Sequence, residues 1–178
     1  MGIKQFIQNR QLASIKAFNK RGEWRPGENS PRFVGLILCI EDVSELILLR
    51  SVHQFFLKKG AKCRICIYQK NHKLTIPAEL INKNVVVLNP KSINWYGMVR
   101  PGHVENFVQD PFDLIVNLSQ SYFFTTTYLA SLARATLKIG RYDWPIASYP
   151  IVLGSGQFDD VDAFILLLDD CLQFIRFR

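Results

Sequence analysis

The run Phe33-Val34-Gly35-Leu36-Ile37-Leu38-Cys39-Ile40 indicates the fold class of this chain. Every residue in it is apolar or glycine, and no polar side chain interrupts it. A half-exposed strand alternates apolar and polar residues, whereas a strand covered on both faces is apolar throughout. The run therefore predicts a central strand of a parallel sheet that has helices on both of its faces.

Strands and helices are expected to alternate along the rest of the chain. The further predicted strands are residues 62–68, 85–88, 113–118, 137–139 and 151–153. One helix is expected to begin after a cap at Asp42 or Ser44 and to end at residue 59. A second is expected to begin near residue 101, and two more are expected at 122–135 and 159–176. Because such alternation is typical of units joined by right-handed crossovers, we predict an α/β fold. Its sheet is expected to be doubly wound, mostly parallel and Rossmann-like, with about five or six strands.

A basic segment, residues 1–32, precedes the single α/β domain predicted for residues 33–178. It combines an expected helix at 3–20 with a linker broken by two prolines and two glycines. Seven basic and two acidic side chains give this segment a net charge of +5, most of the +7 of the whole chain. We predict that it binds an anionic partner, such as RNA, a ribonucleoprotein or an acidic protein surface; the alternative is a solvated face that keeps the chain soluble. The candidate residues are Lys4, Arg10, Lys16, Lys20, Arg21 and Arg25.

The turn after the first strand argues against nucleotide binding. A dinucleotide site needs a Gly-x-Gly-x-x-Gly turn there, so that backbone amides can approach a pyrophosphate. This chain instead has Glu41-Asp42-Val43-Ser44-Glu45, with three carboxylates and no glycine. It also lacks the pattern of a phosphate-binding P-loop. We therefore predict no nucleotide cofactor.

Polar residues that follow two of the strands are the candidates for a small-ligand site. In open α/β sheets, ligands bind beyond the carboxyl ends of the strands, where the strand order reverses. Side chains there could also cap helices and satisfy their unpaired N–H groups. No histidine is spaced to activate a serine, so we predict no catalytic residue. The candidate ligand-binding residues are Glu41, Asp42, Ser119, Gln120 and Ser121.

The cysteines and histidines predict neither a redox pair nor a metal site. Cys63 and Cys66 have the Cys-x-x-Cys spacing but lie inside a predicted strand, where residues three apart point to opposite faces. A zinc site would need a second pair of ligands, so we interpret these thiols as buried and structural. The apolar runs are too short to cross a membrane and the N-terminus does not resemble a signal peptide. We therefore predict a cytoplasmic protein.

Two apolar features are candidates for interaction surfaces. Aromatic side chains at Trp95, Tyr96, Trp144 and Tyr149 would either stack on bases or sugars or close the edge of a core. The predicted last helix carries more apolar residues than one stripe needs, which indicates either burial on two sides or a surface for homo-oligomers or partners. Its additional apolar residues are Leu166, Leu167, Phe174 and Phe177.

Three motifs resemble an uncharacterised family of small, basic bacterial proteins. They are Asn94-Trp95-Tyr96-Gly97-Met98, the segment 111–119 and the segment 132–142. The resemblance implies a basic N-terminal helix followed by one α/β domain, without an assigned activity. More weakly, residues 112–118 and 135–140 resemble the N-terminal Rossmann-like half of heptosyltransferase-like glycosyltransferases. Those enzymes bind their donor chiefly in a second domain, which would start where this chain ends.

These patterns lead to two main hypotheses about function, besides an oligomeric structural protein that associates through the last helix. The first is a non-catalytic α/β interaction protein whose basic N-terminal helix contacts RNA or a ribonucleoprotein. The alternative is a small-ligand-binding protein or a degenerate, glycosyltransferase-like half-enzyme with its site at the carboxyl ends of the strands.

Overall fold

The computed structural model describes residues 2–18, 31–71, 73–142, 149–154 and 160–176. Its centre is one six-stranded sheet with the order β3-β2-β1-β4-β5-β6, and every neighbouring pair of strands is parallel. This order reverses between β1 and β4, which confirms the predicted doubly wound, Rossmann-like sheet. The strands are β1 (Phe33–Ile40), β2 (Lys62–Gln69), β3 (Val85–Leu88), β4 (Phe112–Asn117), β5 (Ala135–Gly140) and β6 (Ile151–Val152).

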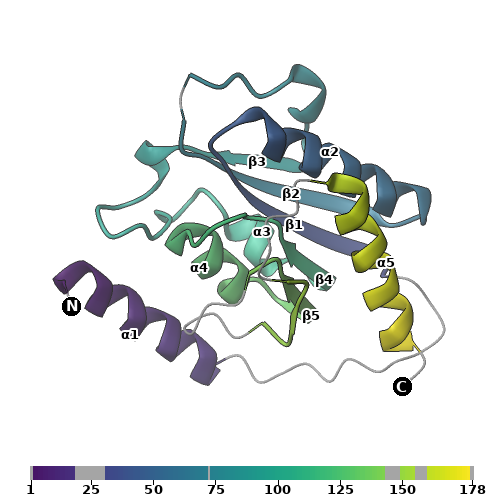
Figure 1. The fold of residues 1–178 in the computed structure, drawn as a ribbon. Helices are drawn as coiled ribbons and strands as arrows, with labels where there is room; N and C mark the ends of the chain where they lie inside the picture. Colours follow the sequence, from purple (N-terminus) through teal and green to yellow (C-terminus); the bar gives the residue numbers. More distant parts are fainter. Residues whose placement is uncertain (1, 19–30, 72, 143–148, 155–159, 177–178) are drawn as a thin grey trace.

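Helices cover both faces of this sheet (Figure 1). Two of them, α2 and α5, pack on one face, and α3 and α4 pack on the other. The N-terminal helix α1 lies against α4 rather than against the sheet. The helices are α1 (Ile3–Phe18), α2 (Val43–Lys58), α3 (Glu105–Gln109), α4 (Phe124–Leu132) and α5 (Val161–Arg176), with short 3₁₀ turns at Ala78–Leu80 and Pro90–Ser92.

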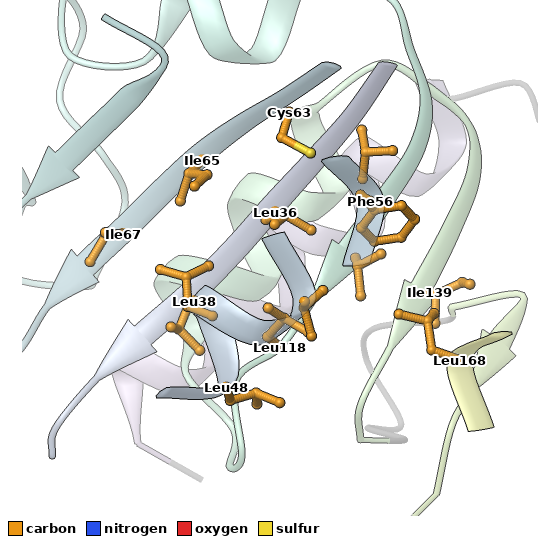
Figure 2. Close-up of a cluster of buried hydrophobic side chains, with 14 of the residues drawn as sticks. Leu36, Leu38, Leu48, Phe56, Cys63, Ile65, Ile67, Leu118, Ile139 and Leu168 are labelled. Carbon is orange, nitrogen blue, oxygen red and sulfur yellow. The ribbon is translucent and has the colours of Figure 1, made fainter. Parts of the chain in front are cut away.

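Strand β1 supplies side chains to both cores, which explains its continuous apolar sequence. Leu36 and Leu38 point toward α2 and α5, as Figure 2 shows, whereas Ile37 and Cys39 point toward α3 and α4. All four side chains are completely buried. Burial of apolar area is the main force that stabilises such a sheet.

The Cys-x-x-Cys pair lies inside β2 and is split between the two cores. Cys63 packs with the core under α2 and α5, and Cys66 packs with the core under α3 and α4. Burial raises the pKa of Cys63 to about 11 and that of Cys66 to about 12. Both thiols are therefore buried, as predicted, and a raised pKa disfavours the thiolate that a reactive cysteine needs.

One helix is shorter than the sequence predicts. The helix expected at 122–135 begins at Phe124 and ends at Leu132. Ala135 already belongs to β5, where it pairs with Phe112 of β4. Sheet pairing has overridden the local helical pattern there, as tertiary contacts often do.

Candidate functional site

The candidate site lies at the carboxyl edge of the sheet, where the chain leaves β1 and β4 toward opposite faces of the sheet. Helix α2 starts there, and it is capped by the acidic turn that precedes it. Asp42 is the N-cap and accepts hydrogen bonds from the backbone N–H of Ser44, at 2.8 Å, and from its hydroxyl, at 2.5 Å. Glu45 completes a capping box, because its carboxylate accepts the N–H groups of Glu41 at 2.5 Å and Asp42 at 3.1 Å. The chain's own carboxylates thus occupy amides that a phosphate would need.

Glu45 is a buried carboxylate, with a relative exposure of 4%. Burial raises its pKa above the ordinary value of 4.5, although the two backbone N–H groups act in the opposite direction. The ionised form is therefore costly, and the hydrogen bonds from the amides offset only part of that cost.

Replacing Glu45 with alanine is expected to lower the free energy of unfolding by about 1–2 kcal/mol, because two backbone donors lose their acceptor. Glu45→Gln keeps an oxygen acceptor but cannot ionise. Since a raised folded-state pKa contributes stability that is lost as pH rises, the stability of the native protein relative to Glu45→Gln should fall as pH rises above 4.5. Urea unfolding of the three proteins at several pH values measures this difference. A relative stability that rises over this range would contradict the assignment.

Ser119 lies at the carboxyl edge of the sheet, close to the ends of β1 and β4, but it does not cap a helix. Its hydroxyl accepts the backbone N–H of Cys39 at 3.1 Å and donates to Thr126 of α4 at 3.1 Å. The Thr126 hydroxyl in turn donates to the carbonyl of Phe123. Helix α4 has Phe123 as its N-cap, so the expectation that Ser119 or Ser121 caps it is wrong. The serine instead connects β1 to α4.

The other predicted residues lie at different places along this edge. Glu41 forms an ion pair with Lys70, which follows β2, and the two charged atoms are 2.6 Å apart. The Lys70 ammonium also lies 5.0 Å from the centre of the Phe123 ring. Gln120 is partly buried and Ser121 is exposed. The structure therefore brings Glu41, Asp42 and Ser119 to one edge, as predicted, but engages them in internal contacts.

A second polar pair lies between β4 and β5. The side-chain amide of Asn117 donates to the hydroxyl of Tyr149 at 2.7 Å, and its carbonyl accepts the N–H of Ser119 at 3.2 Å. The Tyr149 ring lies directly over Gly140, whose missing side chain makes room for it. Burial raises the pKa of Tyr149 to about 12. Tyr149 therefore acts as a neutral hydroxyl that closes this part of the edge.

Arg141, which no sequence pattern singled out, lies at this edge and is only 2% exposed. Its backbone N–H donates to the carbonyl of Asn117 at 3.0 Å, and its guanidinium lies 5.4 Å from the centre of the Phe164 ring of α5. The available signal was its position immediately after β5. In a doubly wound sheet, a residue directly after a strand lies at the carboxyl edge.

The basic helix α1 is docked onto the domain. The side-chain amide of Gln8 donates to the backbone carbonyl of Tyr96 at 2.6 Å. Lys4 and Arg10 are both exposed. Lys16 belongs to the same helix, whereas Lys20, Arg21 and Arg25 lie outside the described residues.

The additional apolar residues of α5, which lie outside its main apolar stripe, have different environments. Leu166 is 66% exposed, whereas Leu167 packs against the core. The side chains of Phe174 and Phe177 lie outside the part that the structure describes. Homo-oligomerisation through this helix stays a prediction.

Two further features concern the residues that the structure describes: membrane-spanning helices and clusters of metal-ligating side chains. Within those residues, no helix is both long and apolar enough to cross a membrane. In the same part of the chain, no three His, Cys, Asp or Glu side chains gather into a group that could hold a metal ion.

Together the strand order and the capped acidic turn define a class: a Rossmann-like α/β protein in which carboxylates of the chain occupy the amides at the start of α2. Over residues 4–172 the chain matches a family of unknown function, DUF6913, and it belongs to that family. This agrees with the resemblance to a family without an assigned activity. No curated protein and no solved structure matches the chain.

Proposed function

We propose that this protein is a non-catalytic RNA-binding protein whose main contact surface is α1. The observation that carries the proposal is the charge of this helix. It has basic residues at Lys4, Arg10 and Lys16, and its 16 residues include no acidic one. Most non-specific affinity for nucleic acid comes from such cations, which displace counterions from phosphates.

The docking of α1 supports the same proposal. A helix with this sequence would be only marginally stable in isolation. Its contact with α4 and the Gln8–Tyr96 hydrogen bond hold it on the domain, while Lys4 and Arg10 remain exposed. A preorganised cationic helix loses less conformational entropy on binding than a flexible tail would.

Salt titration of RNA binding tests the proposal. For a single strand, the logarithm of the binding constant should fall linearly with the logarithm of the salt concentration, by about 0.7 for each neutralised phosphate. The double variant Lys4→Glu/Arg10→Glu should bind more weakly and with a shallower slope. The double variant Lys73→Glu/Lys83→Glu reverses two exposed charges between β2 and β3 and changes the net charge by the same amount. It is the matched control and should behave as the native protein does.

Two outcomes would overturn this function. Equal slopes for the native protein and the double variant would remove α1 from the interface. Absence of RNA binding, together with salt-sensitive binding to an acidic protein, would identify the partner as a protein. Melting temperatures of all variants must match, so that a loss of binding is not a loss of folding.

A small-ligand site at the carboxyl edge is the second candidate, and the strand order favours it. Doubly wound sheets bind ligands at the carboxyl edge where the strand order reverses, which here is between β1 and β4. Arg141 places a buried cation near that edge. A glycosyltransferase-like half-enzyme would use this edge. Thermal-shift measurements with sugar nucleotides separate the candidates, because a ligand that binds only the native state raises its apparent stability.

A further inference from the structure

We infer, building on the proposed RNA binding, that Trp95 is a base-stacking platform and that the RNA bound beside α1 is single-stranded. This tryptophan belongs to a short turn, Asn94-Trp95-Tyr96-Gly97-Met98, which we call the Trp95 turn. It connects the 3₁₀ turn after β3 to the segment that leads into α3.

The Trp95 turn is closed by its own hydrogen bonds. The N–H of Gly97 donates to the carbonyl of Asn94 at 3.0 Å, and the N–H of Asn94 donates to the carbonyl of Met98 at 2.9 Å. The Asn94 side chain accepts the N–H of Met98 at 2.9 Å. Gly97 has a φ of +93°, a conformation that side chains other than glycine rarely adopt. These features define one tight backbone conformation.

The Trp95 turn is also attached to two helices. Gln8 of α1 donates to the carbonyl of Tyr96 at 2.6 Å, and the Thr125 hydroxyl of α4 donates to the carbonyl of Gly97 at 2.8 Å. The tip is therefore held next to α1, the helix that we propose to contact RNA. A rigid support matters because a platform that is already ordered does not have to be ordered on binding.

Trp95 itself is 64% exposed at this supported tip. Its ring meets that of Tyr96 at 5.0 Å between centres and at 89°, an edge-on contact. Because an edge-on contact covers at most one face of a ring, at least one face of the indole is not covered by Tyr96. Tryptophan is usually well buried, so a rigid turn that presents it to solvent indicates a binding role.

The positive charge around the Trp95 turn favours a ligand that carries phosphate groups. Residues 84–104 contain no aspartate or glutamate. Exposed Lys91 and Arg100 flank the turn on its two arms, which are joined by the pairing of Ile93 with Val99. An exposed aromatic ring among cations is the arrangement that binds single-stranded nucleic acid, because phosphates meet cations while unpaired bases stack on the ring. In a duplex the faces of the bases are already stacked on one another, so they are not accessible to the Trp95 ring.

The test compares two Trp95 variants on two RNA ligands at one salt concentration. The ligands are a short uridine homopolymer, whose bases are unstacked, and an RNA hairpin with the same number of phosphates, each labelled for fluorescence anisotropy. The two strands of the hairpin are joined by a polyether linker, so that it has no unpaired base. Trp95→Ala should weaken binding to the single strand about tenfold, which corresponds to about 1.4 kcal/mol, and leave binding to the hairpin unchanged. Trp95→Phe keeps an aromatic face and should retain most of the affinity. Ile47→Ala removes a similarly exposed apolar side chain, 54% against 64%, from α2 on the opposite face of the sheet and is the matched control.

The salt dependence separates failure of this inference from failure of the proposed function. Trp95→Ala removes no phosphate contact, so its salt slope should equal that of the native protein. If the native protein binds RNA but Trp95→Ala binds the single strand equally well, the stacking role is wrong and the function of α1 stands. If the native protein binds neither RNA, both are wrong. An equal loss for the single strand and the hairpin would also contradict stacking.

Discussion

Replacing Phe56 with alanine should lower the free energy of unfolding by about 3–5 kcal/mol, the usual cost of removing a buried phenyl group. Phe56 lies near the end of α2 and is completely buried in the core between α2, α5 and the sheet. Figure 2 shows its ring in that cluster, in the region of Leu36. The truncation removes apolar contacts and leaves a cavity that a β-sheet cannot readily collapse. Since domains of this size have a total stability of about 5–15 kcal/mol, the variant should be close to unfolding at 37 °C.

The next residue provides the control for this prediction. Leu57 is an apolar residue on the same helix, but it is 50% exposed. Leu57→Ala should therefore cost under about 1 kcal/mol. Urea denaturation followed by circular dichroism measures both values. Similar costs for the two variants would mean that α2 does not pack on the sheet through Phe56.

Gly140→Ala should destabilise the protein by about 3 kcal/mol, because the new methyl group would enter the space of the Tyr149 ring. A Cβ atom at residue 140 would lie 2.7 Å from Cγ and Cε2 of that ring, far inside van der Waals contact. An aromatic ring cannot bend out of the way, so Tyr149 would have to move. Its hydrogen bond with Asn117, at 2.7 Å, would then be lost as well.

A double-mutant cycle separates this clash from a general intolerance of side chains at residue 140. In the Tyr149→Ala background the obstructing ring is absent, so Gly140→Ala should cost little or even stabilise β5. The two substitutions should therefore show a coupling energy of at least about 2 kcal/mol. If Gly140→Ala were equally costly in both backgrounds, packing of Tyr149 on Gly140 would be excluded as the reason for the glycine.

Local patterns predicted the elements that depend on neighbouring residues. The apolar run of β1 predicted a strand covered on both faces, and Asp42 was a recognisable helix cap, because capping involves residues two or three positions apart. The contact made by Ser119 could not be predicted from such local patterns. A serine before a helix is typical of a cap, yet its partner is the N–H of Cys39, which lies 80 residues away in the chain. A choice between a local and a distant N–H donor depends on which strand becomes the neighbour.

The roles of Gly140 and Arg141 could not be predicted for a related reason. From the sequence, Gly140 looks like the end of a strand and Arg141 like the start of a loop. The structure shows that the glycine accommodates an aromatic ring and that the arginine is buried beside Phe164. Tyr149 and Phe164 come from other segments, so neither contact leaves a periodic signal in the chain. The exposure of Trp95 could not be predicted from the sequence either, because an aromatic residue in a turn can be buried or exposed.

The order of apolar and polar residues was enough to establish an α/β protein with a buried first strand, split cysteines and an acidic, glycine-free turn before α2. These properties follow from periodicity and from short-range hydrogen bonds, which neighbouring residues largely decide. Only the folded chain decided that Glu41 and Ser119 form internal contacts at the carboxyl edge, that α1 is held against α4, and that Trp95 is exposed on the turn attached to α1. Each of these depends on groups distant in sequence being brought together, and it is the packing of the sheet that selects those pairs.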